Sequence, residues 1–287
     1  MENSMASLWR RGGSRWLVWS VAMLLLAPGL CAACLDNQEG QVVQGGLLWG
    51  TVAPGSSVTL DGEALDVLAD GTTVMGFGRN AAASALLVVK GAVPCEETLQ
   101  IASRDYKIQR VEGVPQKTVT PPPEQTARIK RERALVGAAK SRRLPRPDLL
   151  QDALSGFAWP VQGPISGVYG SQRYYNGEPR SPHYGVDVAV PTGTPVLAPT
   201  AGVITLAEPD LFYSGGTVIL DHGFGLSSSF LHLSKVSVEA GQEVSTGEPI
   251  GEVGATGRAT GPHLDWRMSW RRQRVDPQLL APPMPKP

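Results

Sequence analysis

The sequence predicts an all-β protein in which two β-rich domains are joined by a proline-rich, helical linker. Three observations support this prediction. Short apolar and β-branched runs recur, turn pairs such as Asp-Gly and Gly-Thr separate them, and good helix formers gather in one central segment. We expect an N-terminal targeting segment at residues 1–33, a small β-sandwich at 34–115, the linker at 116–156 and a second, antiparallel β domain at 157–282.

Residues 1–33 have the pattern of a secretory signal peptide. Arg10, Arg11 and Arg15 precede the apolar run "WLVWSVAMLLLAPGL", and small residues follow it. We therefore expect the mature chain to be exported to the periplasm or cell envelope. An uncleaved membrane anchor stays open, because the apolar run approaches the length that spans a bilayer. Membrane association is expected only in that case, or if Cys34 carries a lipid.

The cysteines predict a disulfide in the first β domain. The chain contains three cysteines, and cleavage near Ala33 would leave Cys34 and Cys95. An even pair in an oxidising compartment favours a disulfide. Two unpaired thiols, or a lipid on Cys34, are the alternatives.

The first β domain shows no catalytic pattern. Its turn signals recur at intervals of roughly ten residues, which is typical of a small β-sandwich. It contains no histidine, so we interpret it as a non-catalytic module. The whole chain balances 26 Lys and Arg against 26 Asp and Glu, and only 6% of its residues are aromatic. Neither value favours nucleic-acid binding.

The linker begins with a stiff segment and continues as a helix. Three consecutive prolines end at Pro123 and exclude the interior of a sheet. Pro123 also suits a first helical turn, and "EQTARIKRERALVGAAK" consists mostly of good helix formers. Its basic residues either face solvent or meet an anionic wall polymer or lipid surface.

All four histidines of the chain fall in the second β domain. His183 and Asp187 are four residues apart, and on a strand an even separation places both side chains on one face. An imidazole and a carboxylate on one surface are two suitable ligands for zinc. His222, in the turn-like "LDHGFG", is expected to hold a turn through hydrogen bonds to the backbone.

The run "HLDWRMSW" alternates between apolar and polar residues. Its polar face carries His263, Asp265 and Arg267. If this strand lies beside the one that carries Asp187, their polar side chains meet. His232, in the alternating run "FLHLS", would reach the same groove.

Three separated segments carry a family resemblance. "HYGVDVAVPTGTPVLAPTAGVI", "HLS" and "GATGRATGPHLDW" resemble the successive motifs of the lysostaphin/LytM-type zinc metallopeptidases, over roughly residues 160–280. The resemblance implies a LytM-like antiparallel β domain with a metal groove. It also implies zinc ligation by His183 and Asp187 and catalytic roles for His232 and His263. Asp265 stands where the family has its third zinc ligand, a histidine.

This departure has three readings. Asp265 completes a site of one histidine and two aspartates, since carboxylates also bind zinc. Alternatively, the site is dead and the domain works by binding. In the third reading, Asp265 pairs with Arg267 or another cation and binds no metal.

The sequence therefore leads to one expected function and one alternative. We expect an exported metalloendopeptidase with one Zn²⁺ per chain, which hydrolyses peptide cross-links of bacterial peptidoglycan through metal-activated water. Its metal ligands would be His183, Asp187 and Asp265. The alternative is a catalytically degenerate LytM-domain protein that binds the cell wall or activates a wall amidase.

Overall fold

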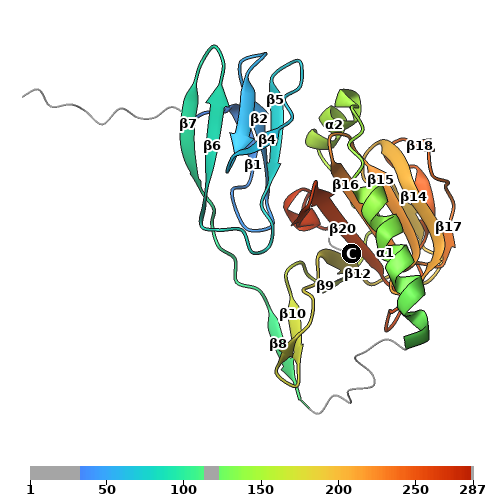
Figure 1. The fold of residues 1–287 in the computed structure, drawn as a ribbon. Coiled ribbons are helices and arrows are strands. Elements are labelled where there is room, and N and C mark those ends of the chain that lie inside the picture. The colour runs from blue at the N-terminus through green and yellow to red at the C-terminus, as the bar shows by residue number, and fades with distance from the viewer. Residues whose placement is uncertain (1–32, 113–122, 286–287) are drawn as a thin grey trace, which may run out of the picture. The chain divides into compact units, whose positions relative to one another are not determined.

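The computed structural model describes residues 33–112 and 123–285 (Figure 1). The predicted signal peptide lies outside these residues except for Ala33, and so does the start of the proline-rich linker. Within the described parts of the chain, no helix has the length and apolar character needed to cross a membrane.

The N-terminal β domain is built from two antiparallel sheets. One sheet has the order β1-β2-β5 and the other β4-β3-β6-β7. The strands are β1 (Asp36–Gly40), β2 (Leu47–Thr51), β3 (Ser57–Leu60), β4 (Glu63–Leu65), β5 (Thr72–Gly76), β6 (Ser84–Lys90) and β7 (Cys95–Gln100). On β6, Ala85, Leu87 and Val89 are buried and alternate with more exposed residues, as expected for a strand with one face on the core. The predicted β-rich domain is confirmed.

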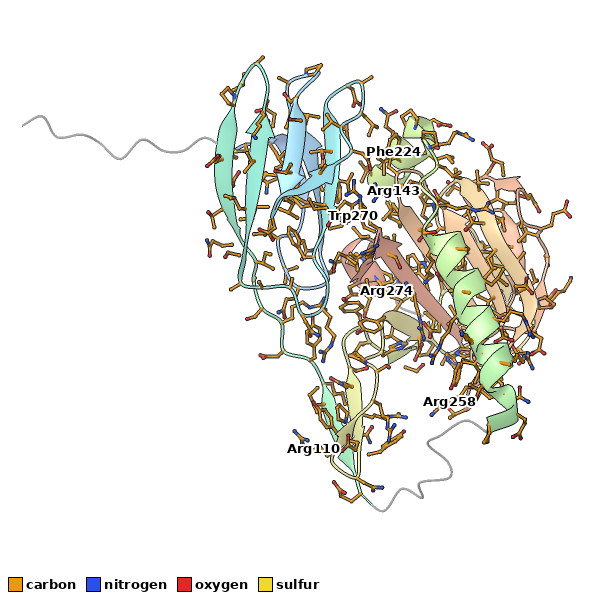
Figure 2. The ribbon with its side chains drawn as sticks, viewed as in Figure 1. Arg110, Arg143, Phe224, Arg258, Trp270 and Arg274 are labelled. Carbon is orange, nitrogen blue, oxygen red and sulfur yellow. A yellow bond between two sulfur atoms is a disulfide. The ribbon has the colours of Figure 1, made fainter. Side chains whose placement is uncertain are left out.

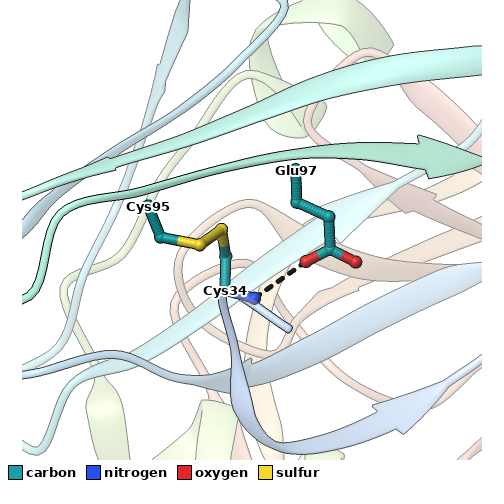
Figure 3. Close-up of a disulfide and its surroundings, with 3 residues drawn as sticks. All are labelled: Cys34, Cys95 and Glu97. Carbon is teal, nitrogen blue, oxygen red and sulfur yellow. Dashed lines mark hydrogen bonds between the residues drawn. A yellow bond between two sulfur atoms is a disulfide. The ribbon is translucent and has the colours of Figure 1, made fainter. Parts of the chain in front are cut away.

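A disulfide joins Cys34 to Cys95, at the start of β7 (Figure 3). The two Cα atoms are 5.6 Å apart, which is within the usual range for a bridged pair. The backbone N–H of Cys34 also donates to Oε2 of Glu97 at 2.8 Å. The predicted disulfide is confirmed, and it uses the sulfur that a lipid on Cys34 would need.

The predicted linker helix packs against the second β domain. The helical elements of this region are η2 (Pro123–Gln125), α1 (Thr126–Lys140) and α2 (Pro147–Leu154). Ala139 of α1 is buried with Leu206, Leu211 and Ile219, and Val136 packs against the same cluster. Figure 1 shows α1 crossing β14 and β15. The interpretation of residues 116–156 as a linker is therefore incomplete, since α1 covers part of a sheet.

The second helix, α2, was not expected from the sequence. Pro147 occupies its first turn, where the missing N–H costs nothing. Leu149, Leu150 and Ala153 are buried on one side. Leu150 and Ala153 pack in the main hydrophobic core of the protein.

The second β domain centres on an eight-stranded sheet. Its order is β18-β14-β15-β16-β20-β12-β9, with β21 paired to β20. These strands are β9 (Ile165–Gly167), β12 (Gly185–Val188), β14 (Gly202–Leu211), β15 (Gly215–Asp221), β16 (Leu226–Leu233), β18 (Glu243–Val244), β20 (Leu264–Trp270) and β21 (Gln273–Val275). Neighbouring strands of this sheet pair antiparallel, which agrees with the prediction.

Smaller elements surround this sheet. β13 (Pro195–Leu197), β19 (Pro249–Glu252) and β17 (Lys235–Val236) form a three-stranded sheet, and η3 (Pro277–Leu279) follows β21. β10 (Gln172–Tyr175) pairs with β11 (Glu178–Pro179) and, in parallel, with β8 (Ile108–Val111). The parallel pair is an exception that local sequence patterns did not indicate.

The register of the large sheet aligns polar side chains on one face. Leu264, Trp266, Met268 and Trp270 are buried on the core side of β20, as predicted. On the other face, cross-strand partners form successive rows. These rows are Leu231–Asp265–Asp187, Ser229–Arg267–Gly185 and Ser227–Ser269–Arg274. Because Ile219 is the partner of Ser229 on β15, α1 packs on this same face.

The disulfide is expected to stabilise the protein. Replacing Cys34 and Cys95 with serine should lower the free energy of unfolding by about 2–4 kcal/mol, because the bond closes a long loop in the unfolded chain. Denaturant unfolding of both proteins with and without reductant measures this effect. Reductant should shift the wild-type midpoint and leave the double variant unchanged; equal wild-type midpoints would contradict the prediction.

Candidate metal centre

Three predicted ligands converge on one side of the large sheet. Asp187 on β12 is the direct cross-strand partner of Asp265 on β20. His183 lies in the segment before β12, so the expectation that it shares a strand with Asp187 is wrong. One ligand atom from each of the three side chains nevertheless lies within 4.8 Å of the others. The structure therefore brings together the three residues predicted to bind metal.

Two of these ligand atoms have unused hydrogen-bonding capacity. Nε2 of His183 and Oδ1 of Asp187 are buried and have no hydrogen-bond partner among the described residues. They lie 3.1 Å apart. Buried polar atoms without partners are costly, so this arrangement favours a bound cation between them.

Asp265 is held by Arg267, two residues further along β20. Nε of Arg267 donates to Oδ1 at 2.9 Å and to Oδ2 at 3.0 Å, and Nη2 donates to Oδ2 at 2.5 Å. Asp265 is only 2% exposed. Burial alone would raise its pKa, but the charge and hydrogen bonds of Arg267 outweigh burial and lower the pKa. Asp265 is therefore a buried carboxylate.

Gly185 makes room for this ion pair. A Cβ atom at position 185 would collide with Oδ1 of Asp265 and with Cγ of Arg267. A Cβ atom at Gly167, on the neighbouring β9, would likewise collide with the carboxylate of Asp187. The two glycines leave space for both carboxylates beside the backbone.

These residues fit a zinc ion. Like charges directly opposite each other on neighbouring strands destabilise a sheet, and Arg267 compensates only one of the two carboxylates. Each carboxylate oxygen has two lone pairs, so Oδ1 of Asp265 keeps acceptor capacity beyond its bond to Arg267. Hydrogen bonds to a ligating carboxylate commonly orient it. One imidazole and two carboxylates would leave a fourth zinc position open, as in catalytic sites.

His232 reaches the groove through a β-bulge. Between two registered pairs of β15 and β16, Leu231 and His232 together oppose the single residue Thr217. His232 has a φ of +65°, which is uncommon for a residue other than glycine. Such bulges redirect a side chain, and this one turns His232 to the side of the sheet that carries Asp265. Local alternation along the sequence would place it on the opposite face.

The ring of His232 is oriented by one backbone carbonyl. Nδ1 lies 2.8 Å from the carbonyl oxygen of Thr256. Because a carbonyl can only accept, Nδ1 carries the proton and Nε2 presents a lone pair. Burial is the main cause of a lowered pKa for His232, so the ring is neutral at neutral pH.

His263 has the same arrangement beside it. Its Nδ1 lies 2.8 Å from the carbonyl oxygen of Gly261, and its Nε2 lies 4.0 Å from Oδ1 of Asp187. The ring centroids of His232 and His263 are 4.9 Å apart. Two imidazoles next to the three ligand candidates can accept or deliver a proton.

His222 is not part of the groove cluster. Its ring is fully buried, with Nδ1 2.9 Å from the carbonyl oxygen of Ala201 and Nε2 2.9 Å from Oγ of Ser228. Its hydrogen bonds connect neighbouring strands and agree with the structural role expected from the sequence.

The groove also contains residues that the sequence did not single out. Lys140 of α1 and Arg274 of β21 line it together with the candidate ligands. Nothing local marks them, because one lies in the predicted linker and the other follows a turn. The basic character of the helix was visible in the sequence, but its position over the groove was not.

Comparisons with known proteins agree with this geometry. A family model described as peptidase family M23 matches residues 181–277, which include all five candidate site residues. A solved structure, a putative peptidase M23 from Pseudomonas aeruginosa, is 34% identical. It has a TM-score of 0.64, and the match covers 83% of this chain and 94% of that one. The chain belongs to peptidase family M23.

Curated relatives of this M23 protein include named endopeptidases. The peptidoglycan DD-endopeptidase ShyA of Vibrio cholerae is 37% identical over 138 residues, which are 48% of this chain and 32% of the relative. The DD-carboxypeptidase/endopeptidase Mpg of Neisseria meningitidis is 43% identical over 104 residues, 36% of this chain and 24% of the relative. The chain thus spans about a third or less of the length of these relatives.

Removing Arg267 should destabilise this M23 protein. Arg267→Gln leaves Asp265 buried without its cation, so we expect the free energy of unfolding to fall by about 3 kcal/mol. Adding Asp265→Asn should recover part of that loss. Denaturant unfolding measures both effects, with Lys235→Gln as the control because its ion pair with Glu252 is exposed. The prediction is wrong if Arg267→Gln costs no more than the control.

His222 should make stability depend on pH. Burial lowers its pKa from 6.5 to about 4, so below pH 6.5 the unfolded chain binds a proton that the folded chain does not. Stability from His222 is therefore present above pH 6.5 and is lost as pH falls toward 4, by about 3 kcal/mol.

The neighbouring Asp221 acts in the opposite direction. Burial raises its pKa to about 6, so its contribution is lost as pH rises from 3.8 to 6. A His222→Gln variant isolates the histidine, because Asp221 is common to both proteins. The difference in unfolding free energy between wild type and variant should shrink on acidification; a constant difference would refute the assignment.

Proposed function

We propose that this protein is an exported zinc metalloendopeptidase that hydrolyses peptide cross-links of bacterial peptidoglycan. The observation that carries the proposal is the set of His183, Asp187 and Asp265, whose ligand atoms lie within 4.8 Å of one another beside the imidazoles of His232 and His263. Membership of peptidase family M23 supports the chemistry. The name of the relative ShyA, a peptidoglycan DD-endopeptidase, supports the substrate. The signal-peptide pattern supports location in the periplasm or envelope.

Zinc would be held by His183, Asp187 and Asp265, with Arg267 orienting Asp265. When bound, zinc supplies Lewis-acid polarisation of the scissile carbonyl and of water. This chain supplies the proton transfers. Nε2 of His232 or His263 accepts a proton from the attacking water while the water oxygen forms a bond to the carbonyl carbon. The same proton is then delivered to the leaving nitrogen as the carbon–nitrogen bond breaks.

One observation favours a second candidate function. Both oxygens of Asp265 accept hydrogen bonds from Arg267, which competes with metal for the carboxylate. If Asp265 stays paired with Arg267 and binds no metal, the groove binds wall peptide without hydrolysing it, or serves to activate a wall amidase. The metal content of the protein separates the two functions.

Wild-type protein dialysed against zinc and then against zinc-free buffer should retain about one zinc per chain. His183→Ala and Asp265→Asn should lose it, because each removes a ligand. His263→Ala should keep zinc, as should Asp105→Asn, an exposed carboxylate in the first β domain. Elemental analysis measures the content. Metal-free wild type, with zinc gained only by Asp265→His, would support the binding function instead.

Digestion of cross-linked peptidoglycan should follow the zinc content. Chromatography of the products should show cross-linked dimers converted to monomers, with activity lost on chelation and restored by zinc. His263→Ala should lower the rate by on the order of a hundredfold or more, because a proton-transfer group is missing. A zinc-loaded wild type that leaves dimers intact would overturn the proposed reaction.

A further inference from the structure

A group of three cations lies next to the candidate metal centre. Lys140, at the last position of α1, lines the same groove as Arg267 and Arg274. Arg274, labelled in Figure 2, is on β21, and its cross-strand partner Ser269 lies two positions after Arg267 on β20. We call these three residues the cationic cluster. It combines a helix and two strands that are far apart in the sequence.

The cationic cluster has too few acidic partners. Arg267 is paired with Asp265. Lys140 and Arg274 form no ion pair among the described residues, and the guanidinium of Arg274 donates to the neutral hydroxyl of Ser269, at 2.6 Å. Lys140 and Arg274 are both partly buried. Like charges in a partly buried groove repel one another unless an anion joins them.

Electrostatics support the same conclusion. Burial, followed by the charges of Arg274 and Arg267, lowers the pKa of Lys140 well below its usual value. Burial and Arg267 also lower the pKa of Arg274. An anion bound between them would relieve both effects, since a nearby negative charge favours the protonated form.

An unpaired hydroxyl lies in the same row as Arg267. Ser229 on β16 is the cross-strand partner of Arg267 and lines the groove. It is 2% exposed, and its Oγ has no hydrogen-bond partner among the described residues. Cations beside a hydroxyl with unused capacity form an environment suited to an oxyanion.

We propose that the cationic cluster, with Ser229 beneath it, is a subsite for a carboxylate of the substrate peptide. The proposal rests on the proposed function for the position of the peptide. Strands rise about 3.3 Å per residue, so Arg267 and Arg274 lie roughly 7 and 13 Å along the sheet from Asp265. Consider a peptide extended along β20 with its scissile carbonyl at the metal ligands. Groups of this peptide that lie about two to four residues from the scissile carbonyl would then reach the cationic cluster.

This subsite defines a substrate class. It favours cross-links whose stem peptides carry free carboxylates and gives no advantage to neutral glycine bridges. Arg267 then serves two purposes, because it orients Asp265 and also contributes positive charge to the subsite. A phosphate-bearing wall polymer would satisfy the charge but not the alignment with the metal ligands.

Peptide binding to metal-free protein tests the subsite without requiring hydrolysis. The probes are N-acetyl-D-alanyl-D-alanyl-D-alanine, its C-terminal amide and inorganic phosphate, each titrated while the backbone amide signals of the protein are followed by NMR. The acid should bind about tenfold more tightly than the amide, because the charge-assisted hydrogen bonds require the carboxylate. Lys140→Gln and Arg274→Gln should each reduce this preference severalfold.

Lys130→Gln is the matched control, because Lys130 lies on the same helix but is exposed and outside the groove lining. It should keep the full preference. Equal binding of acid and amide, or a preference that survives in both cluster variants, overturns the proposal. Binding of phosphate without any preference between the peptides also overturns it. The protein could show the carboxylate preference and yet retain no zinc after dialysis and leave peptidoglycan undigested. That result would contradict the proposed function and still support the subsite.

Discussion

The centre of this protein is governed by the repulsion between two carboxylates placed opposite each other on neighbouring strands. Antiparallel pairing of β12 with β20 makes Asp187 and Asp265 direct partners, and burial of Asp265 strengthens their interaction. Positive charge must therefore come from nearby. Arg267 supplies part of it, and the unused atoms of His183 and Asp187 mark where a divalent cation would supply the rest. The glycines at 167 and 185 are consequences of the same crowding.

Much of this arrangement could be predicted from sequence because it depends on strand alternation. The core face of β20 and the shared face of Asp265 and Arg267 follow from a period of two, and the cysteine pair follows from compartment chemistry. The four histidines also pointed to the correct domain. His222 could be separated from the others because its turn-like surroundings differ from an alternating strand.

Other features depend on long-range contacts or local irregularities and could not be predicted in this way. His183 precedes its expected strand, and His232 faces the groove only because of a bulge and a positive φ. The docking of α1 was missed because Ile129, Val136 and Ala139 give only a thin apolar stripe on a basic helix. The competition between Arg267 and a metal for Asp265 was visible as an alternative, but its geometry required the three-dimensional structure.

The backbone conformation at His232 affects how any substitution there is interpreted. A left-handed φ of +65° is more frequent for asparagine and histidine, whose polar side chains can hydrogen-bond locally, than for alanine, which pays on the order of 1 kcal/mol for it without that compensation. An alanine variant therefore combines loss of the imidazole with local backbone strain that can close the bulge and rotate Leu231. Asparagine keeps the backbone preference while it removes the base. In this protein, alanine scanning at position 232 would thus overstate the chemical contribution of the side chain, and asparagine gives the cleaner comparison.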